Sequence, residues 1–253
     1  MISHTANPDF STLLNTVDAE VLLQHLVALE NEIADASGPI QTHIDEHLSY
    51  LARQSLCNIE ALDRKENSDA SIGTSVSDDT GILNNYDEQL ATSSLMTLFD
   101  RLFASQQVKL VRSGSEPEYI PADNTNPARI EFAHGFFASA LHEVSHWCIA
   151  GEKRRQLPDF GYWYAPDGRS AAQQHAFECL EIKPQALECL FTLACRRPFQ
   201  VSQDNLFADF DTSASTFTAD VYRQAAQYLA APKNLPRDAK TLLRALLTIC
   251  IIK

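Results

Sequence analysis

Apolar residues recur at helical spacing through the N-terminal region, residues 10–66. One apolar series lies between residues 17 and 33 and a second between 44 and 62, with a Gly-Pro turn sequence at 35–39. This pattern predicts two helices joined as a hairpin. Residues 67–85 are polar and acidic and show no apolar period, which predicts a flexible linker.

The rest of the chain has the pattern of a folded domain, in which short β-rich runs lie among longer helical periods. The predicted elements are a helix across 90–103, strands at 108–111, 119–120 and 129–132, a helix at 136–150 ended by Gly151, a strand at 159–164, and helices at 170–182, 184–195, 216–230 and 238–252. Pro184 is tolerated in the first turn of a helix, so the two helices beside it can also be continuous.

Strands and helices do not alternate regularly, which favours an α+β fold over a parallel α/β sheet. The expected architecture is a central helix packed with a small sheet, plus an N-terminal helical extension. The domains predicted from these patterns are an acidic helical extension at 1–66, the linker at 67–85, and one folded domain at 86–253.

Charge changes this picture in one respect. The net charge of −13 comes entirely from residues 1–92, which hold 16 acidic and 3 basic side chains, while residues 93–253 are neutral overall. A globally acidic chain should not bind bare nucleic acid well, because binding to phosphates needs clustered cations. The sequence shows neither an apolar run long enough to span a bilayer nor a secretory signal, and its six cysteines lack C-x-x-C spacing. We therefore expect a cytoplasmic protein with reduced thiols and no membrane partner.

The strongest chemical signal is the run His142-Glu143-Val144-Ser145-His146 in the central predicted helix. Residues four apart share a helix face, so both imidazoles can bind one metal ion. Glu143 lies about 100° around the axis and suits a base acting on metal-bound water rather than a ligand. From the His and Glu content, about 0.015 such matches are expected by chance.

Two histidines leave a metal site incomplete, so a third ligand should come from another helix. Glu178 and Glu181 share a face of the helix predicted at 170–182, among apolar residues. Glu181 is the preferred ligand and Glu178 the alternate. Two histidines and one carboxylate leave open coordination positions, as in zinc hydrolases and in non-haem iron enzymes that activate oxygen, and the spacing does not choose between them.

Four residues near the motif are weaker candidates for binding a substrate. His134 precedes His142 by two helical turns and is expected on the same helix face. Arg154 belongs to a basic run directly after the central helix, and Tyr162 and Tyr164 could line a pocket. For each of them an ordinary structural role is at least as good an explanation.

Four segments taken together resemble the elongation factor P hydroxylase family. They are residues 133–151, 159–169, 181–187 and 198–206. The resemblance covers about 95–232, and residues 1–92 match nothing in the family pattern.

The resemblance implies an oxidoreductase, a monooxygenase that hydroxylates the β-lysylated lysine of translation elongation factor P, its protein substrate and partner. It further implies a zincin-like metal helix, His142 and His146 as ligands with a glutamate from 178–181, iron as the metal, and molecular oxygen as co-substrate. The alternatives are a zincin-type metallopeptidase with zinc and Glu143 as the base, and a non-catalytic module that acts through its acidic extension.

Overall fold

The computed structural model describes residues 16–34, 80–162, 168–203 and 215–251. Its helices are α1 (Thr16–Ala34), α3 (Thr80–Leu102), α4 (Phe137–Arg154), α5 (Ala171–Ala194), α6 (Phe217–Ala230) and α7 (Arg237–Ile251), and its strands are β1 (Val108–Ser113), β2 (Glu118–Ile120) and β3 (Ala128–Ala133). Short 3-10 turns lie at η2 (Ala104–Gln106), η3 (Pro158–Gly161) and η4 (Pro232–Asn234). This element set is α+β, as predicted. None of the described helices is long and apolar enough to cross a membrane.

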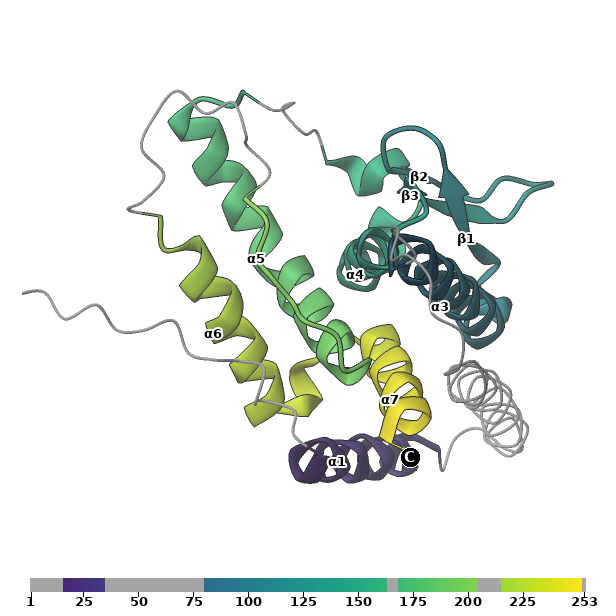
Figure 1. The fold of residues 1–253 in the computed structure, drawn as a ribbon, viewed down its shortest axis with the longest axis vertical. Coiled ribbons are helices and arrows are strands. Elements are labelled where there is room, and N and C mark those ends of the chain that lie inside the picture. The colour runs from purple at the N-terminus through teal and green to yellow at the C-terminus, as the bar shows by residue number, and fades with distance from the viewer. Residues whose placement is uncertain (1–15, 35–79, 163–167, 204–214, 252–253) are drawn as a thin grey trace, which may run out of the picture.

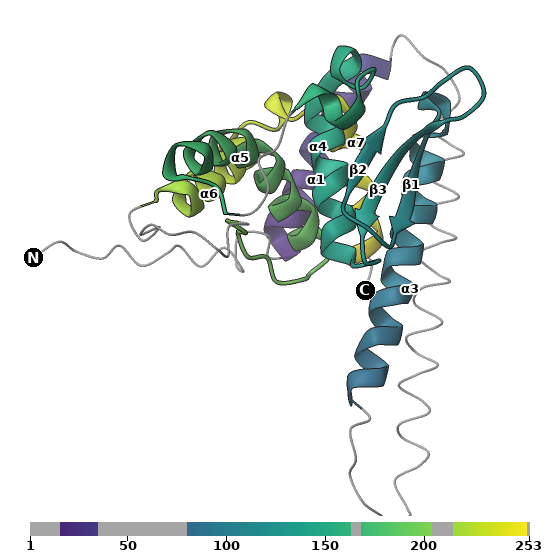
Figure 2. The ribbon, with the colours of Figure 1, turned by 90° about the horizontal axis from the view of Figure 1, so that it is seen from above.

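The three strands form one small mixed sheet in the order β1-β3-β2, with β1 parallel and β2 antiparallel to β3. Along the central strand β3, Ala128, Ile130 and Phe132 are buried, while the residues between them are partly exposed. This alternation is the period of a strand with one face against the core. Figures 1 and 2 show α3 and α4 covering that side of the sheet.

Helix α4 lies in the centre of the molecule, between the sheet on one side and α5 and α7 on the other (Figure 2). Its buried apolar residues include Leu141, Val144 and Trp147. The Trp147 ring makes edge contacts with Phe99 of α3 and with Phe103, the residue just after that helix, at centroid distances of 5.3 and 4.9 Å. Such aromatic packing fixes the position and the rotation of α4.

Both ends of α4 are also held by polar contacts. At its start, Glu88 of α3 accepts a hydrogen bond from the Phe137 backbone N–H at 2.8 Å, which satisfies a donor that the helix itself leaves unpaired. At the predicted stop, Gly151, the chain leaves helical geometry with φ 67° and ψ 170°, although α4 continues to Arg154. Arg155, just beyond, pairs with Asp238 of α7 at 2.7 Å and lies over the Trp147 ring.

Helix α5 runs without interruption through Pro184, so the two helices predicted beside that proline are one. Its start is a capping box in which Ser170 and Gln173 satisfy each other's backbone N–H groups. Because the helix is continuous, the directions of its side chains follow regular helical spacing over all 24 residues. Residues 181 and 188, seven apart, therefore lie within about 20° of each other around the axis.

The N-terminal helix α1 is packed onto the rest of the protein. It contacts α7 and η4, and Ala19, Leu22 and Leu26 are buried in the same apolar cluster as the α7 leucines. The second helix of the predicted hairpin, at 44–62, lies outside the described residues. Of the predicted linker at 67–85, residues 67–79 lie outside the described residues, and residues 80–85 belong to α3.

The strand predicted at 159–164 was wrong where the structure describes it. Pro158 opens the 3-10 turn η3, and Asp159 and Phe160 have positive φ angles of 46° and 57°. Tertiary contacts stabilise these conformations, because Asp159 accepts the backbone N–H of Tyr119 at 2.9 Å and the Phe160 ring stacks on Tyr119 at 4.1 Å. Aromatic residues are typical of strands, but here the Phe160 ring packs a turn against β2 at the edge of the sheet.

Candidate metal centre

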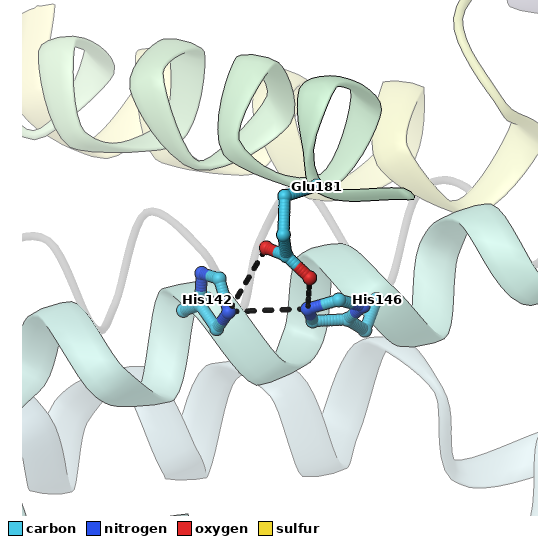
Figure 3. A group of neighbouring side chains, drawn as sticks. All are labelled: His142, His146 and Glu181. Atoms are coloured by element: carbon cyan, nitrogen blue, oxygen red, sulfur yellow. Dashed lines mark hydrogen bonds and ion pairs between the residues drawn. The ribbon is translucent and has the colours of Figure 1, made fainter. Parts of the chain in front are cut away.

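His142 and His146 lie on the same face of α4, directed towards α5 (Figure 3). Their Nε2 atoms are 3.1 Å apart. Two ligands about 2.1 Å from one ion, at angles between those of octahedral and tetrahedral sites, are about 3.0–3.4 Å apart. The imidazole pair predicted from the sequence therefore has the separation of two ligands on a single cation.

Glu181 approaches the two rings from α5. Its Oε1 is 3.2 Å from His146 Nε2, and its Oε2 is 3.6 Å from His142 Nε2. The side chain is almost fully buried, and Oε2 has no hydrogen-bond partner among the residues that the structure describes. A buried carboxylate oxygen without a partner is costly, and a cation between the three residues would satisfy it. His142, His146 and Glu181 also form the group of described residues whose ligand atoms suit a metal ion, all within 4.8 Å of one another.

Charges and hydrogen bonds from neighbouring side chains shift the pKa values of two residues of the group. Burial lowers the pKa of His142, but the hydrogen bond and charge of Glu188, with further carboxylates nearby, outweigh that effect and raise its pKa to about 10. Burial raises the pKa of Glu181, but the charges of His146 and His142 and a hydrogen bond from Gln185 lower it to about 2. In the metal-free protein a proton on His142 therefore carries the positive charge that a metal ion would otherwise supply.

Glu178, the alternate ligand, points elsewhere. Its Oε1 accepts from Gln174 at 3.3 Å and its Oε2 accepts from Ser215 at 3.0 Å. The first contact lies within α5, and the second joins α5 to the segment before α6. The structure therefore brings Glu181, and not Glu178, to the two histidines.

Glu188 is a residue of this site that the sequence reasoning missed. Its Oε2 is 2.9 Å from His142 Nδ1, on the side of the ring away from Nε2. The available signal was its spacing of seven from Glu181, which places both carboxylates on one face of a continuous helix. That signal was hidden because Pro184, between them, left the continuity of the helix open.

Glu143 is partly buried beside the group without being one of the three converging residues. Burial raises the pKa of its carboxyl, and the positive charges of His142 and His146 oppose that rise. A carboxyl group in this position can exchange a proton with a molecule bound at the neighbouring group.

The candidates for substrate binding that the structure describes are not part of the group formed by His142, His146 and Glu181. His134 is exposed and precedes the start of α4 at Phe137, so it does not share the helix face of His142 as expected. The Arg154 guanidinium lies 3.8 Å from the centroid of the Tyr162 ring, which brings two of the candidates together. Tyr164 is outside the described residues.

Comparison with known proteins identifies the group to which this site belongs. The sequence model of the elongation factor P hydroxylase family matches residues 98–250, more than half of the chain. This chain belongs to that family. It is also 44% identical over 154 residues to the elongation factor P lysine hydroxylase of Haemophilus influenzae, covering 60% of this chain and 85% of that protein.

The family match includes every residue of the candidate metal centre. It begins within α3, contains α4 and α5, and extends through most of α7. It therefore reaches further towards the C-terminus than the resemblance predicted at 95–232. Helix α1 lies outside the matched residues.

Proposed function

We propose that this protein is a metal-dependent monooxygenase that hydroxylates a lysine side chain of translation elongation factor P. The observation that carries the proposal is that the residues matched by the family contain a largely buried group of two histidines and one glutamate suited to a metal ion. The Haemophilus influenzae relative, whose name is elongation factor P lysine hydroxylase, supports the choice of substrate.

Iron(II) is the metal that we propose. A set of two histidines and one carboxylate with open positions is typical of non-haem iron oxygenases, and such an ion, when bound, would supply the activation of molecular oxygen. Zinc fits the same donor atoms but has no redox chemistry. In a monooxygenase reaction one oxygen atom enters a C–H bond of lysine, and two electrons from a reductant together with two protons convert the other to water.

The residues of the chain contribute charge and position. His142 and His146 are neutral ligands, so Glu181 is the one anionic donor of the group. Its burial excludes water from one side of the group and strengthens its interaction with a cation. We propose that Glu143 exchanges a proton with a bound molecule or orients the substrate.

The zincin-like character that we propose is confined to the metal helix α4. A metallopeptidase would use the same two histidines with zinc and with Glu143 as the base. Nothing in the family match or in the name of the relative supports peptide cleavage.

Mass spectrometry of elongation factor P tests the proposal. The substrate is purified from a host that lacks its own hydroxylase gene and carries this gene, its His146→Ala variant, or an empty vector. We expect the modified lysine to be one oxygen atom heavier only with the wild-type gene. Equal lysine masses with the wild-type gene and the empty vector would refute the proposed activity, and full hydroxylation by the His146→Ala variant would refute the role of the metal centre.

A further inference from the structure

We propose that Glu188 is a positioning residue that holds the His142 ring with Nε2 directed into the metal centre. The inference rests on the proposed metal function of His142, His146 and Glu181. It assigns a role to a carboxylate group that is not part of the group formed by His142, His146 and Glu181.

The geometry of the ring carries the inference. The two imidazole nitrogens point to opposite sides of the ring, so a hydrogen bond that fixes Nδ1 also fixes the direction of Nε2. Glu188 Oε2 is 2.9 Å from His142 Nδ1, a normal length for a charge-assisted hydrogen bond. On the other side of the ring, Nε2 lies 3.1 Å from His146 Nε2.

The same contact determines which nitrogen carries the proton. A neutral imidazole has one N–H, and a carboxylate oxygen only accepts hydrogen bonds. With Glu188 at Nδ1, the neutral ring keeps its proton there and presents the Nε2 lone pair to the site. Metal-binding histidines commonly have such a carboxylate or carbonyl partner, which fixes the tautomer and raises the basicity of the ligand.

The placement of Glu188 on α5 supports this role. It lies two helical turns after Glu181 on the same face, so one helix supplies both carboxylates. His146 pairs with Glu181, the earlier carboxylate, and His142 Nδ1 pairs with Glu188, the later one. This order is expected where α4 and α5 run antiparallel. The Glu188 side chain is 13% exposed against 2% for Glu181, so the two carboxylates have different environments. Burying most of a carboxylate requires a partner, and His142 is that partner.

A direct ligand role for Glu188 does not fit these positions. Its Oε2 contacts the side of the His142 ring that faces away from the Nε2 atoms. To reach the same ion, Glu188 would have to leave His142 and move around the ring.

The inference is tested by metal affinity and by the tautomer of His142 in full-length protein. Zinc(II) is titrated against a competing chelator into wild type, Glu188→Ala, Glu188→Gln and the control Glu178→Ala, whose carboxylate lies on the same helix but contacts Gln174 and Ser215. We expect Glu188→Ala to bind about 10–100-fold more weakly. Glu188→Gln, which keeps an acceptor oxygen, should recover part of the loss, and the control should bind like the wild type.

Imidazole ¹⁵N NMR of the zinc-loaded proteins provides a readout that a merely structural role would not change. We expect the wild type and Glu188→Gln to show His142 with a proton on Nδ1 and zinc on Nε2, and Glu188→Ala to lose the hydrogen-bonded Nδ1–H signal. If Glu188→Ala does not fold, a loss of affinity in Glu188→Gln that the Glu178→Ala control does not share tests the same contact.

Two outcomes would overturn the inference. One is wild-type affinity in both Glu188 variants. The other is loss of binding in Glu188→Ala as complete as in His142→Ala, which would make Glu188 a ligand. A wild-type protein that binds no metal would instead contradict the proposed function, so the two failures are distinguishable.

Discussion

Replacing Glu181 with alanine should remove most of the thermal stabilisation that a metal ion gives to the protein. An ion that binds only the folded state stabilises it by about 2.7 kcal/mol at a free concentration one hundred times its Kd. For a chain of this size each kcal/mol corresponds to about 2–4 °C in Tm. The wild type should therefore gain about 5–11 °C at that concentration.

The loss in the variant follows from the structure. Glu181 supplies the anionic donor of the group, and one of its oxygens has no hydrogen-bond partner in the described part of the chain. Residues that merely support a metal ligand are commonly worth 10–100-fold in affinity, so removing the ligand itself should cost at least about 100-fold. At the same metal concentration the variant is then near its own Kd, where stabilisation is about 0.4 kcal/mol. The expected gain in Tm is about 1–2 °C.

The assay is differential scanning calorimetry with and without iron(II) under anaerobic conditions, with zinc(II) in parallel. Each variant is compared with its own metal-free form, so a change in intrinsic stability does not affect the result. Glu178→Ala is the matched control and should keep the full wild-type shift. A full shift in Glu181→Ala, or its loss in Glu178→Ala, would refute the assignment of the third ligand.

Three further predictions concern charge, stability and chemistry. The pKa of His142 in the metal-free fold, about 10, lies above its ordinary value of 6.5. Its protonated ring therefore stabilises the fold fully below pH 6.5, and this contribution is lost as pH rises through 10. The Tm of the metal-free wild type should fall relative to that of His142→Gln between these pH values, and a constant difference in Tm would contradict this. Asp238→Ala should lower the free energy of unfolding by about 3 kcal/mol in urea titrations, since it leaves the largely buried Arg155 guanidinium, 12% exposed, without its carboxylate partner. An unchanged midpoint would show that the pair is not stabilising. Glu143→Gln should abolish lysine hydroxylation while zinc affinity stays within a few-fold of wild type, and retained hydroxylation would exclude Glu143 from the chemistry.

The part of the site that the sequence predicts is local in origin. The pair His142 and His146 follows from helical geometry alone, because residues four apart share a face wherever the helix packs. The choice between Glu178 and Glu181 is different, since both lie on one side of α5. It depends on how α5 is rotated against α4, which long-range packing determines.

Other features depended on contacts between distant segments and could not be predicted. Glu188 lies on the same face as Glu181 only if α5 continues through Pro184, and local propensity does not decide whether it does. The turn η3 was predicted as a strand because its aromatic content is typical of strands, whereas Asp159 and Phe160 are held by contacts with Tyr119 about forty residues earlier. The longer helices were predicted well, since their apolar periods are strong over many residues.

The most direct test of the account is a crystal structure of the iron-loaded protein with anomalous diffraction measured at the iron absorption edge. We expect one strong anomalous peak about 2 Å from His142 Nε2, His146 Nε2 and a carboxylate oxygen of Glu181, with Glu188 still bonded to His142 Nδ1. A peak located elsewhere, or coordinated by Glu178 in place of Glu181, would contradict the account.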